Sequence, residues 1–305
     1  MEDFFEEVSC NLCGADAYEV ILEPTLSEED FRVSLEQLAV PQNPTIKTAR
    51  IVRCCHCGLC YANPRPRSKQ LHLLYGRMSD PNSLDEMPFK LRSGFPYLRK
   101  IQMFASGRRL LDIGCYTGFF LKAAQDRGWE VLGLEPSEWA ASFAKEKLQL
   151  PVITGTLEEA NLGASSFDVV TLLEVLEHAA DPKNFLKRVH HLLAPEGLIV
   201  VAVPDISSFF ARVLKERWWF LKPVHLYYFD LKTLSCYLRQ AGFQMVWKGT
   251  AGGLFSLGHL AVRLHPYLGN FSTLLSNTLV CMRLHKIGIW LNLGDLLLVC
   301  ARKTK

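Results

Sequence analysis

The sequence predicts an α/β fold in which a doubly wound parallel sheet follows a small cysteine-rich module. Three observations predict it. From residue 108 onward, short continuous apolar runs alternate with amphipathic segments, which is the pattern of parallel strands covered by helices on both faces. The first apolar run ends in a glycine-containing turn at 114–118. Six of the ten cysteines fall within the first 60 residues.

Strands and helices are expected to alternate along this part of the chain. The predicted strands are 108–114, 129–135, 151–155, 167–173, 198–203, 243–249 and 296–303. The predicted helices are 119–128, 138–148, one that begins at Pro182 and ends before Gly197, and 231–242. Ser137 and Asp181 are expected to cap the second and third helices, because a side-chain oxygen there accepts a free N–H of the first turn.

Composition limits the classes of protein that fit. Of the 305 residues, 49% are hydrophobic and 21% charged, which is typical of a globular protein. The net charge of +3 is too small to indicate a nucleic-acid binder. The acidic N-terminus lacks the basic stretch followed by an apolar run that a secretory signal has. The sequence contains no uninterrupted run of about 18 apolar residues, so no membrane span is predicted. We therefore expect a cytoplasmic protein.

The early cysteines form two Cys-x-x-Cys-Gly motifs, CNLCG at 10–14 and CCHCG at 54–58. In a reducing compartment, clustered cysteines indicate a metal before a disulfide. Two such pairs supply the four thiolates of a closed, structural zinc site. The predicted ligands are Cys10, Cys13, Cys54 and Cys57. Cys60 is an alternative, because it also completes a Cys-x-x-Cys with Cys57. The remaining cysteines are interpreted as small core residues: Cys115, Cys236, Cys281 and Cys300.

These patterns predict three parts. A zinc-ribbon-like module spans 1–66, a helical connector 67–104, and the α/β domain 105–305, with a helical insertion at 249–294 before the last strand. The insertion holds three basic residues and no Asp or Glu. It is interpreted as covering helices, a lid, a dimer face, or a surface that touches membrane or a lipid-linked substrate.

The turn at 114–118 indicates a nucleotide-type site. In an open parallel sheet, ligands bind beyond the carboxyl ends of the strands, near the point where strand order reverses. Glu135 ends the second strand 17 residues after Gly118, where a carboxylate can accept hydrogen bonds from ribose hydroxyls. The chain lacks the P-loop and Gly-x-Gly-x-x-Gly patterns, and the turn holds no Lys or Arg for a pyrophosphate. A nucleoside-like ligand without phosphate fits better.

Four motifs, in this order, resemble class I S-adenosylmethionine-dependent methyltransferases. They are LLDIGCYTGFFL (110–121), VLGLEPS (131–137), FDVVTLLEVLEHAADPKNFLKRVHHLLAPEGLIVVAVPD (167–205) and HLYYFDLKTLSCYLRQAGF (225–243). The resemblance covers residues 105–248, and LNLGDLLLVCARK (291–303) is similar to the usual last strand. The branch that looks most similar is bacterial and includes ubiquinone-pathway O-methyltransferases and methyltransferases of glycan and natural-product clusters.

The resemblance implies a set of cofactor-binding residues. Asp112 and the two turn glycines would line the methionine and ribose part of S-adenosylmethionine, Glu135 would hold the ribose hydroxyls, and 155–157 would border the adenine. Tyr116 departs from the family's usual glycine, and we interpret its ring as a shield over the cofactor. The expected cofactor-binding residues are Asp112, Gly114, Cys115, Tyr116, Gly118, Glu135, Pro136, Thr156, Leu157 and Glu174. The alternative is a tight strand-to-helix connection that binds no ligand.

Transfer to a hydroxyl needs a base, and histidine titrates in the right range. His225 follows the fifth strand, where this fold builds its acceptor pocket, and His178 follows the fourth strand. Either histidine is alternatively structural. Glu177 is expected to orient one of them or to be solvated. Four aromatic side chains are expected to wall the pocket, with packing in the core as the alternative: Trp218, Trp219, Tyr227 and Tyr228.

The sequence thus predicts methyl transfer to a hydroxyl or carbon of a small-molecule acceptor, such as a sugar, lipid or natural-product intermediate. The expected cofactors are S-adenosylmethionine and structural zinc, and no nucleic-acid partner is expected. Three alternatives stay open at this point. They are a zinc-knuckle RNA methyltransferase, a sugar C-methyltransferase, and a non-catalytic protein that binds S-adenosylmethionine.

Overall fold

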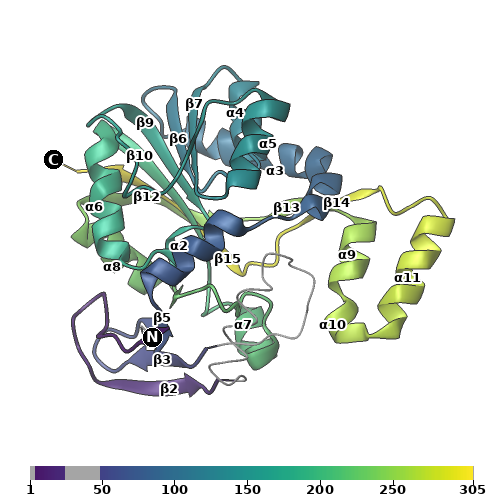
Figure 1. Ribbon diagram of the computed structural model, residues 1–305, viewed down its shortest axis with the longest axis horizontal. Helices are drawn as coiled ribbons and strands as arrows, with labels where there is room; N and C mark the ends of the chain where they lie inside the picture. The colour runs from purple at the N-terminus through teal and green to yellow at the C-terminus, as the bar shows by residue number, and fades with distance from the viewer. Residues whose placement is uncertain (1–3, 25–48, 305) are drawn as a thin grey trace.

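The computed structural model of the chain describes residues 4–24 and 49–304 (Figure 1). Its centre is a seven-stranded sheet in the order β12-β15-β10-β9-β6-β7-β8. These strands are β6 (Arg109–Ile113), β7 (Glu130–Glu135), β8 (Val152–Thr154), β9 (Phe167–Leu173), β10 (Leu193–Pro204), β12 (Phe243–Thr250) and β15 (Leu296–Lys303). Strands β6 to β10 pair in parallel, and β15 is antiparallel to both of its neighbours. The predicted α/β fold class is confirmed.

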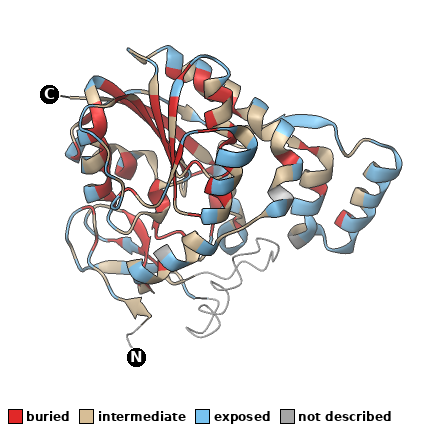
Figure 2. Ribbon diagram, turned by 45° about the horizontal axis from the view of Figure 1, so that its top comes forward, coloured by how far each residue is buried: buried red, intermediate tan, exposed pale blue. Residues whose placement is uncertain are grey.

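Helices cover both faces of this sheet. They are α2 (Ser68–Arg77), α3 (Met87–Gln102), α4 (Phe119–Gln125), α5 (Glu138–Leu148), α6 (Pro182–Leu192) and α8 (Leu231–Gln240), with 3-10 turns η1 (Pro81–Glu86) and η2 (Leu176–His178). Helix α7 (Phe209–Leu214) and the 3-10 turn η3 (Lys215–Arg217) lie beside the N-terminal module instead, where Ala211 packs with Ile51 and Cys60. One apolar core joins α3, α4 and α5 to the sheet, and a second joins α6 and α8 to the opposite face. The strands between them are therefore buried on both sides (Figure 2).

The predicted helix starts agree with the structure in detail. The Ser137 hydroxyl accepts a hydrogen bond from the N–H of Ala140 at 3.1 Å, and the Asp181 carboxylate accepts one from Asn184 at 3.2 Å. The helix after Asp181 ends at Leu192, earlier than predicted, because residues 193–197 already lie in β10.

The N-terminal module shares a sheet with the second half of the chain. Its strands β2 (Tyr18–Leu22), β3 (Ile51–Cys54) and β4 (Cys60–Ala62) are joined by β11 (Tyr227–Tyr228), which pairs with β4. Strands β1 (Phe5–Glu6) and β5 (Arg65–Pro66) form a separate pair. Asn11 also bonds the Asp181 carboxylate and the Tyr237 hydroxyl, at 3.0 and 3.1 Å. The module is thereby held against α6 and α8.

A helical segment lies between β12 and β15. It consists of β13 (Gly253–Ser256), α9 (Leu257–Arg263), α10 (His265–Leu268), α11 (Asn270–Cys281) and β14 (Gly288–Leu291), with β13 and β14 paired antiparallel. The helices extend away from the sheet (Figure 1). Within the described part of the chain, no helix is long and apolar enough to cross a membrane.

Two expectations about single side chains are corrected. Trp218, Tyr227 and Tyr228 are at most 2% exposed and pack in the core, so they do not wall an open pocket. The segment that carries them pairs with β4 of the module and is covered on both sides. This contact joins distant parts of the chain, so the local sequence gives no sign of it. Cys115 and Cys300 are buried as expected, whereas Cys281 is exposed at the end of α11.

Candidate cofactor site and buried histidine pair

The turn between β6 and α4 adopts a backbone that glycine favours. Gly114 and Gly118 have φ of +71° and +78°, and Tyr116 between them has φ of +49°. A Cβ on Gly114 would lie 2.6 Å from Cγ2 of Val175, so packing also requires glycine there. The left-handed backbone at Tyr116 explains why glycine suits that position in similar turns. The Tyr116 ring packs near Trp139, with centroids 6.0 Å apart.

Glu135 connects this turn to the next strand. One carboxylate oxygen accepts the backbone N–H of Tyr116 at 2.8 Å, and the other accepts that of Ser137 at 2.8 Å. The carboxyl is buried, and burial raises its pKa while the two N–H donors lower it. Each oxygen of a carboxylate accepts more than one hydrogen bond, so this geometry leaves capacity for the hydroxyls of a ribose.

Asp112 is a second buried carboxyl at the same edge of the sheet. Its Oδ1 accepts a hydrogen bond from the Thr171 hydroxyl at 2.6 Å. Burial, together with the nearby charge of Glu135, raises the pKa of Asp112 to about 7 against the lowering effect of Thr171. Glu174 follows β9 with φ of +58° and is exposed. Three carboxyls at the carboxyl ends of adjacent strands favour a cationic ligand, which S-adenosylmethionine is.

The other predicted cofactor residues lie around this edge. Cys115 is buried and Pro136 half-buried. Thr156 bonds Oε2 of Glu159 through its N–H and its hydroxyl, both at 3.0 Å, which shapes the loop after β8. Leu157 is buried beneath this loop.

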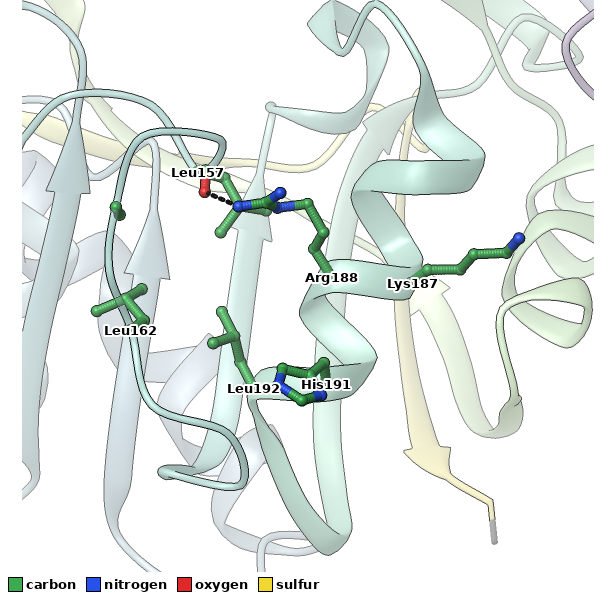
Figure 3. A pocket seen from close by; sticks show the side chains of 7 residues that line it. Leu157, Leu162, Lys187, Arg188, His191 and Leu192 are labelled. Atoms are coloured by element: carbon green, nitrogen blue, oxygen red, sulfur yellow. Dashed lines mark hydrogen bonds between the residues drawn. The ribbon is translucent and has the colours of Figure 1, made fainter.

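A groove of about 340 Å³ opens between the loop after β8 and α6 (Figure 3). The Arg188 guanidinium spans it and donates to the carbonyl of Leu157 at 2.9 Å. The lining residues are Leu157, Ala160, Leu162, Lys187, Arg188, His191 and Leu192. Only Leu157 belongs to the predicted cofactor set, so this groove is not the site that the turn forms.

Glu177, His178 and His225 lie together at the carboxyl edge of the sheet. One ligand atom from each lies within 4.8 Å of the others. The two imidazole rings meet edge to face, with centroids 4.7 Å apart. The 3-10 turn after β9 carries the first two residues, and the N–H of Leu226 bonds the carbonyl of Glu177 at 2.9 Å. The sequence predicted both histidines near the acceptor, and the structure brings them into contact.

Hydrogen bonds define which nitrogen of His178 is basic. Nδ1 lies 3.0 Å from the carbonyl oxygen of Val224 and 2.9 Å from the hydroxyl of Tyr75. A carbonyl only accepts, so Nδ1 carries the proton and Nε2 is the basic nitrogen. Burial lowers the pKa of His178 to about 4, which keeps the ring neutral at physiological pH. The sequence gave no signal for the contact with Tyr75, which comes from α2.

Glu177 is fully buried, so the expectation that it is solvated is wrong. Neither of its oxygens has a hydrogen-bond partner, and Nδ1 of the buried His225 also has none among the described residues. Burial, with the charge of Glu174, raises the pKa of Glu177 to about 8. Burial and the proximity of His178 lower the pKa of His225. Unsatisfied buried groups are costly, and a carboxyl with two imidazoles is suited to proton transfer or to a divalent cation.

The two Cys-x-x-Cys-Gly motifs converge. Sγ of Cys10 lies 3.5 Å from that of Cys57, Sγ of Cys13 lies 3.5 Å from that of Cys54, and all four lie within 4.8 Å of one another. Gly14 and Gly58 have φ near +80° and donate their N–H to the carbonyls of the first cysteine of each motif. Cys60 is not in this group: its buried Sγ lies 3.8 Å from the carbonyl of Gly58.

The cluster fits a metal. Burial raises the pKa of Cys54, but N–H groups of Cys57 and His56 and a hydrogen bond from Cys13 lower it to about 7. Burial raises the pKa of Cys10 to about 11 and raises that of Cys57 as well. A bound cation would lower the pKa of all four thiols, because it stabilises the thiolates. Of the ligand sets that the sequence left open, the structure brings Cys10, Cys13, Cys54 and Cys57 together.

Residues 86–248 match a family model described as a methyltransferase domain, which covers more than half of the chain. The chain belongs to the S-adenosylmethionine-dependent methyltransferase family. The sequence resemblance is confirmed, and a methyl acceptor is implied with the cofactor. The matched region begins at the end of η1 and includes the turn, both acidic strand ends and both histidines.

Several proteins are similar to this methyltransferase. A ubiquinone biosynthesis O-methyltransferase of Azorhizobium caulinodans is 26% identical over 215 residues, which cover 67% of this chain and 83% of that protein. Another, of Ruegeria pomeroyi, is 32% identical over 204 residues, 60% and 77% of the two chains. The crystal structure of a SAM-dependent methyltransferase from Archaeoglobus fulgidus has a TM-score of 0.50 at 20% identity and covers 73% of this chain and all of that one. That structural similarity supports the fold.

Proposed function

We propose that this methyltransferase acts on a hydroxyl or an acidic carbon of a small-molecule acceptor. The observation that carries the proposal is the contact between His178 and His225 beside the buried carboxyl of Glu177. An acceptor of this kind loses a proton as it is methylated, and this group supplies a proton acceptor at the carboxyl edge of the sheet.

The proposed cofactor contacts follow from the two buried carboxyls. Glu135 accepts the ribose hydroxyls while the N–H groups of Tyr116 and Ser137 hold it in place. Asp112 and Glu174 face the cationic methionine part, Thr156 and Leu157 border the adenine, and the Tyr116 ring covers the cofactor. When bound, S-adenosylmethionine supplies a methyl group that is activated by a sulfonium.

His178 is the proposed proton acceptor. Its Nε2 would take the hydroxyl proton of the acceptor as that oxygen forms a bond to the methyl group that bound S-adenosylmethionine would supply. A weak base is sufficient, because the oxygen proton becomes strongly acidic as that bond forms. Val224 and Tyr75 fix the orientation of the ring, and His225 and Glu177 lie behind it as positioning residues.

We also propose that the four clustered thiolates bind zinc. A site with four protein ligands has no open position, so the metal is structural. Its role is to hold the module against the segment that carries His225, through the pairing of β4 with β11.

Calorimetric titration with S-adenosylmethionine tests the cofactor site. We expect binding by the wild type and affinity at least tenfold weaker in Asp112→Ala and Glu135→Ala, about 1.4 kcal/mol. A cationic ligand favours ionised Asp112, whose pKa is about 7 in the free protein. Affinity should therefore fall by up to roughly tenfold for each pH unit below 7, and Asp112→Asn should abolish that dependence. A folded, zinc-loaded protein that binds no cofactor would contradict the site.

An acceptor panel tests the chemistry. With any acceptor that the wild type methylates, His178→Asn should lower kcat by about 10²–10⁴-fold and leave cofactor affinity unchanged. Because protonation of His178 abolishes its role and its pKa is about 4, the wild-type kcat should stay level at neutral pH and fall only as pH approaches 4, when S-adenosylmethionine is kept saturating at each pH. His191→Asn is the matched control, since His191 lies on the exposed face of α6. Equal rates for His178→Asn and the wild type would remove His178 from the mechanism as the proton acceptor.

A further inference from the structure

Residues 257–291, here called the projecting segment, extend from the body of the protein as helices α9, α10 and α11 (Figure 1). The base of the segment is fixed to the fold. Glu86 accepts hydrogen bonds from the N–H and the hydroxyl of Ser256, at 3.1 and 2.6 Å, and the Ser93 hydroxyl accepts from the N–H of Leu254 at 2.7 Å. The segment is therefore held in a defined position, although its helices lie outside the main cores.

The projecting segment exposes most of its apolar side chains. Of residues 257–281, only Ala261 and Ser272 are buried among those described. Helices α10 and α11 are largely exposed in Figure 2, whereas most residues of α9 are intermediate. Ten of the sixteen exposed large hydrophobic side chains of the described chain lie here: Val262, Leu264, Leu268, Phe271, Leu274, Val280, Met282, Ile287, Ile289 and Trp290. Phe271 and Leu274 are each 62% exposed. Exposed apolar side chains in such number on one part of a protein indicate a surface that another body covers.

The charge of the protein is concentrated on the same segment. Arg263, Arg283 and Lys286 are its basic residues, and it contains no Asp or Glu. The rest of the chain has 31 basic and 31 acidic residues, so the whole net charge of +3 falls here. All three basic side chains are exposed, and none forms an ion pair within the described residues.

We propose that the projecting segment docks onto the surface of a lipid bilayer that carries anionic headgroups. Apolar side chains enter the interface between headgroups and acyl chains, and the three basic side chains bind the headgroups. The helices have 7, 4 and 12 residues, which is too short to span a bilayer but sufficient to lie in its surface.

Charge favours a membrane over a second copy of this chain. In a symmetric dimer the same patch meets itself, so the basic residues would face one another with no carboxylate of the segment to pair with them. An anionic bilayer supplies the opposite charge and an apolar layer together.

Flotation of the full, zinc-loaded chain with lipid vesicles tests the proposal. We expect binding to phosphatidylcholine vesicles that contain about a third phosphatidylglycerol, and much weaker binding to phosphatidylcholine alone. Phe271→Ser with Leu274→Ser should lower the partition coefficient at least tenfold. The triple change Arg263→Gln, Arg283→Gln and Lys286→Gln should lower it about 100-fold, roughly fivefold for each charge. High salt should weaken binding of the wild type in the same direction.

Matched controls change the same chemistry elsewhere. Met103→Ser with Val20→Ser removes exposed apolar side chains, and Lys147→Gln, Lys232→Gln and Lys248→Gln removes three exposed charges. Both controls should bind as the wild type does, and all variants should keep its melting temperature and cofactor affinity. The proposal is overturned if the wild type does not float with anionic vesicles, or if the controls lose as much binding as the segment variants. It is equally overturned if light scattering shows a dimer that only Phe271→Ser with Leu274→Ser dissociates.

Discussion

Two parts of this protein are appended to the same sheet, and they are attached in opposite ways. The N-terminal module contributes buried residues to the core under α6 and α8, and its sheet is completed by β11. The projecting segment is apolar too, yet α10 and α11 keep most of their apolar side chains exposed. The segment contacts the fold at its base and through the Tyr267 hydroxyl, which donates to the carbonyl of Arg217 at 2.7 Å. Apolar composition therefore does not decide burial. Strand pairing distinguishes the two parts: β4 of the module pairs with β11, whereas among the described strands β13 and β14 pair only with each other.

The comparison predicts the largest effect for loss of the metal. Cys13→Ser removes one of four converging thiolates, and structural zinc contributes about 10–16 kcal/mol to folding in isolated zinc-finger peptides. We expect loss of bound zinc, a fall of several kcal/mol in the free energy of unfolding, and a large loss of activity, because β11 would lose its partner strand. Zinc content, thermal unfolding and turnover measure these effects.

Cys55→Ser is the matched control for this prediction. Cys55 is adjacent to the cluster in sequence, but it is exposed and lies outside the group of four. It should keep the zinc, the melting temperature and the activity. If Cys13→Ser melts at the wild-type temperature, the module does not depend on its metal.

A smaller effect is expected where the module is fastened to the catalytic half. The Arg65 guanidinium donates to the Tyr227 hydroxyl and to the carbonyl of Ala180, both at 2.8 Å, and its side chain is 12% exposed. Arg65→Ala removes the donor to the hydroxyl of Tyr227 and to the carbonyl of Ala180, so we expect the free energy of unfolding to fall by about 1–3 kcal/mol. Because β11 follows His225 directly, kcat should fall while cofactor affinity stays constant.

Arg53→Ala is the control for Arg65→Ala. Arg53 pairs with Glu19 across the exposed side of the same module, with 48% and 58% of the two side chains accessible. Exposed pairs contribute about 0–1 kcal/mol, so stability and kcat should hardly change. Equal effects from the two substitutions would mean that the module is fastened by something other than Arg65.

Most strands of the sheet could be predicted from the sequence, because each strand is a short continuous apolar run that can be recognised locally. The strand predicted at 167–173 has those bounds in the structure, and Ser137 and Asp181 cap their helices. The pairing of β4 with β11 joins residues more than 160 positions apart, and no local pattern specifies it. For the same reason, the sequence placed Tyr227 and Tyr228 in a pocket wall rather than in the core.

The site was predictable where its residues belong to motifs. The turn, Glu135 and both cysteine pairs could be found from spacing, whereas Tyr75 and Val224 had no signal, although they fix the tautomer of His178. The burial of Glu177 was also missed. A 3-10 turn after β9 places its carboxyl inside the protein, and single-residue chemistry favours solvent for a carboxylate.

The smallest effect is expected in the projecting segment, and it gives the sharpest test of the comparison. Phe271→Ser removes a large apolar side chain that is 62% exposed, so the free energy of unfolding should change by less than about 0.5 kcal/mol. Leu12→Ala removes a smaller volume from the module, but Leu12 is 2% exposed and packs in the core beside Cys10. We expect this substitution to cost about 2–5 kcal/mol. Denaturant unfolding of both variants measures the difference. A cost for Phe271→Ser that approaches that of Leu12→Ala would show that the segment is covered within the protein itself, and the two appended parts would then be attached alike.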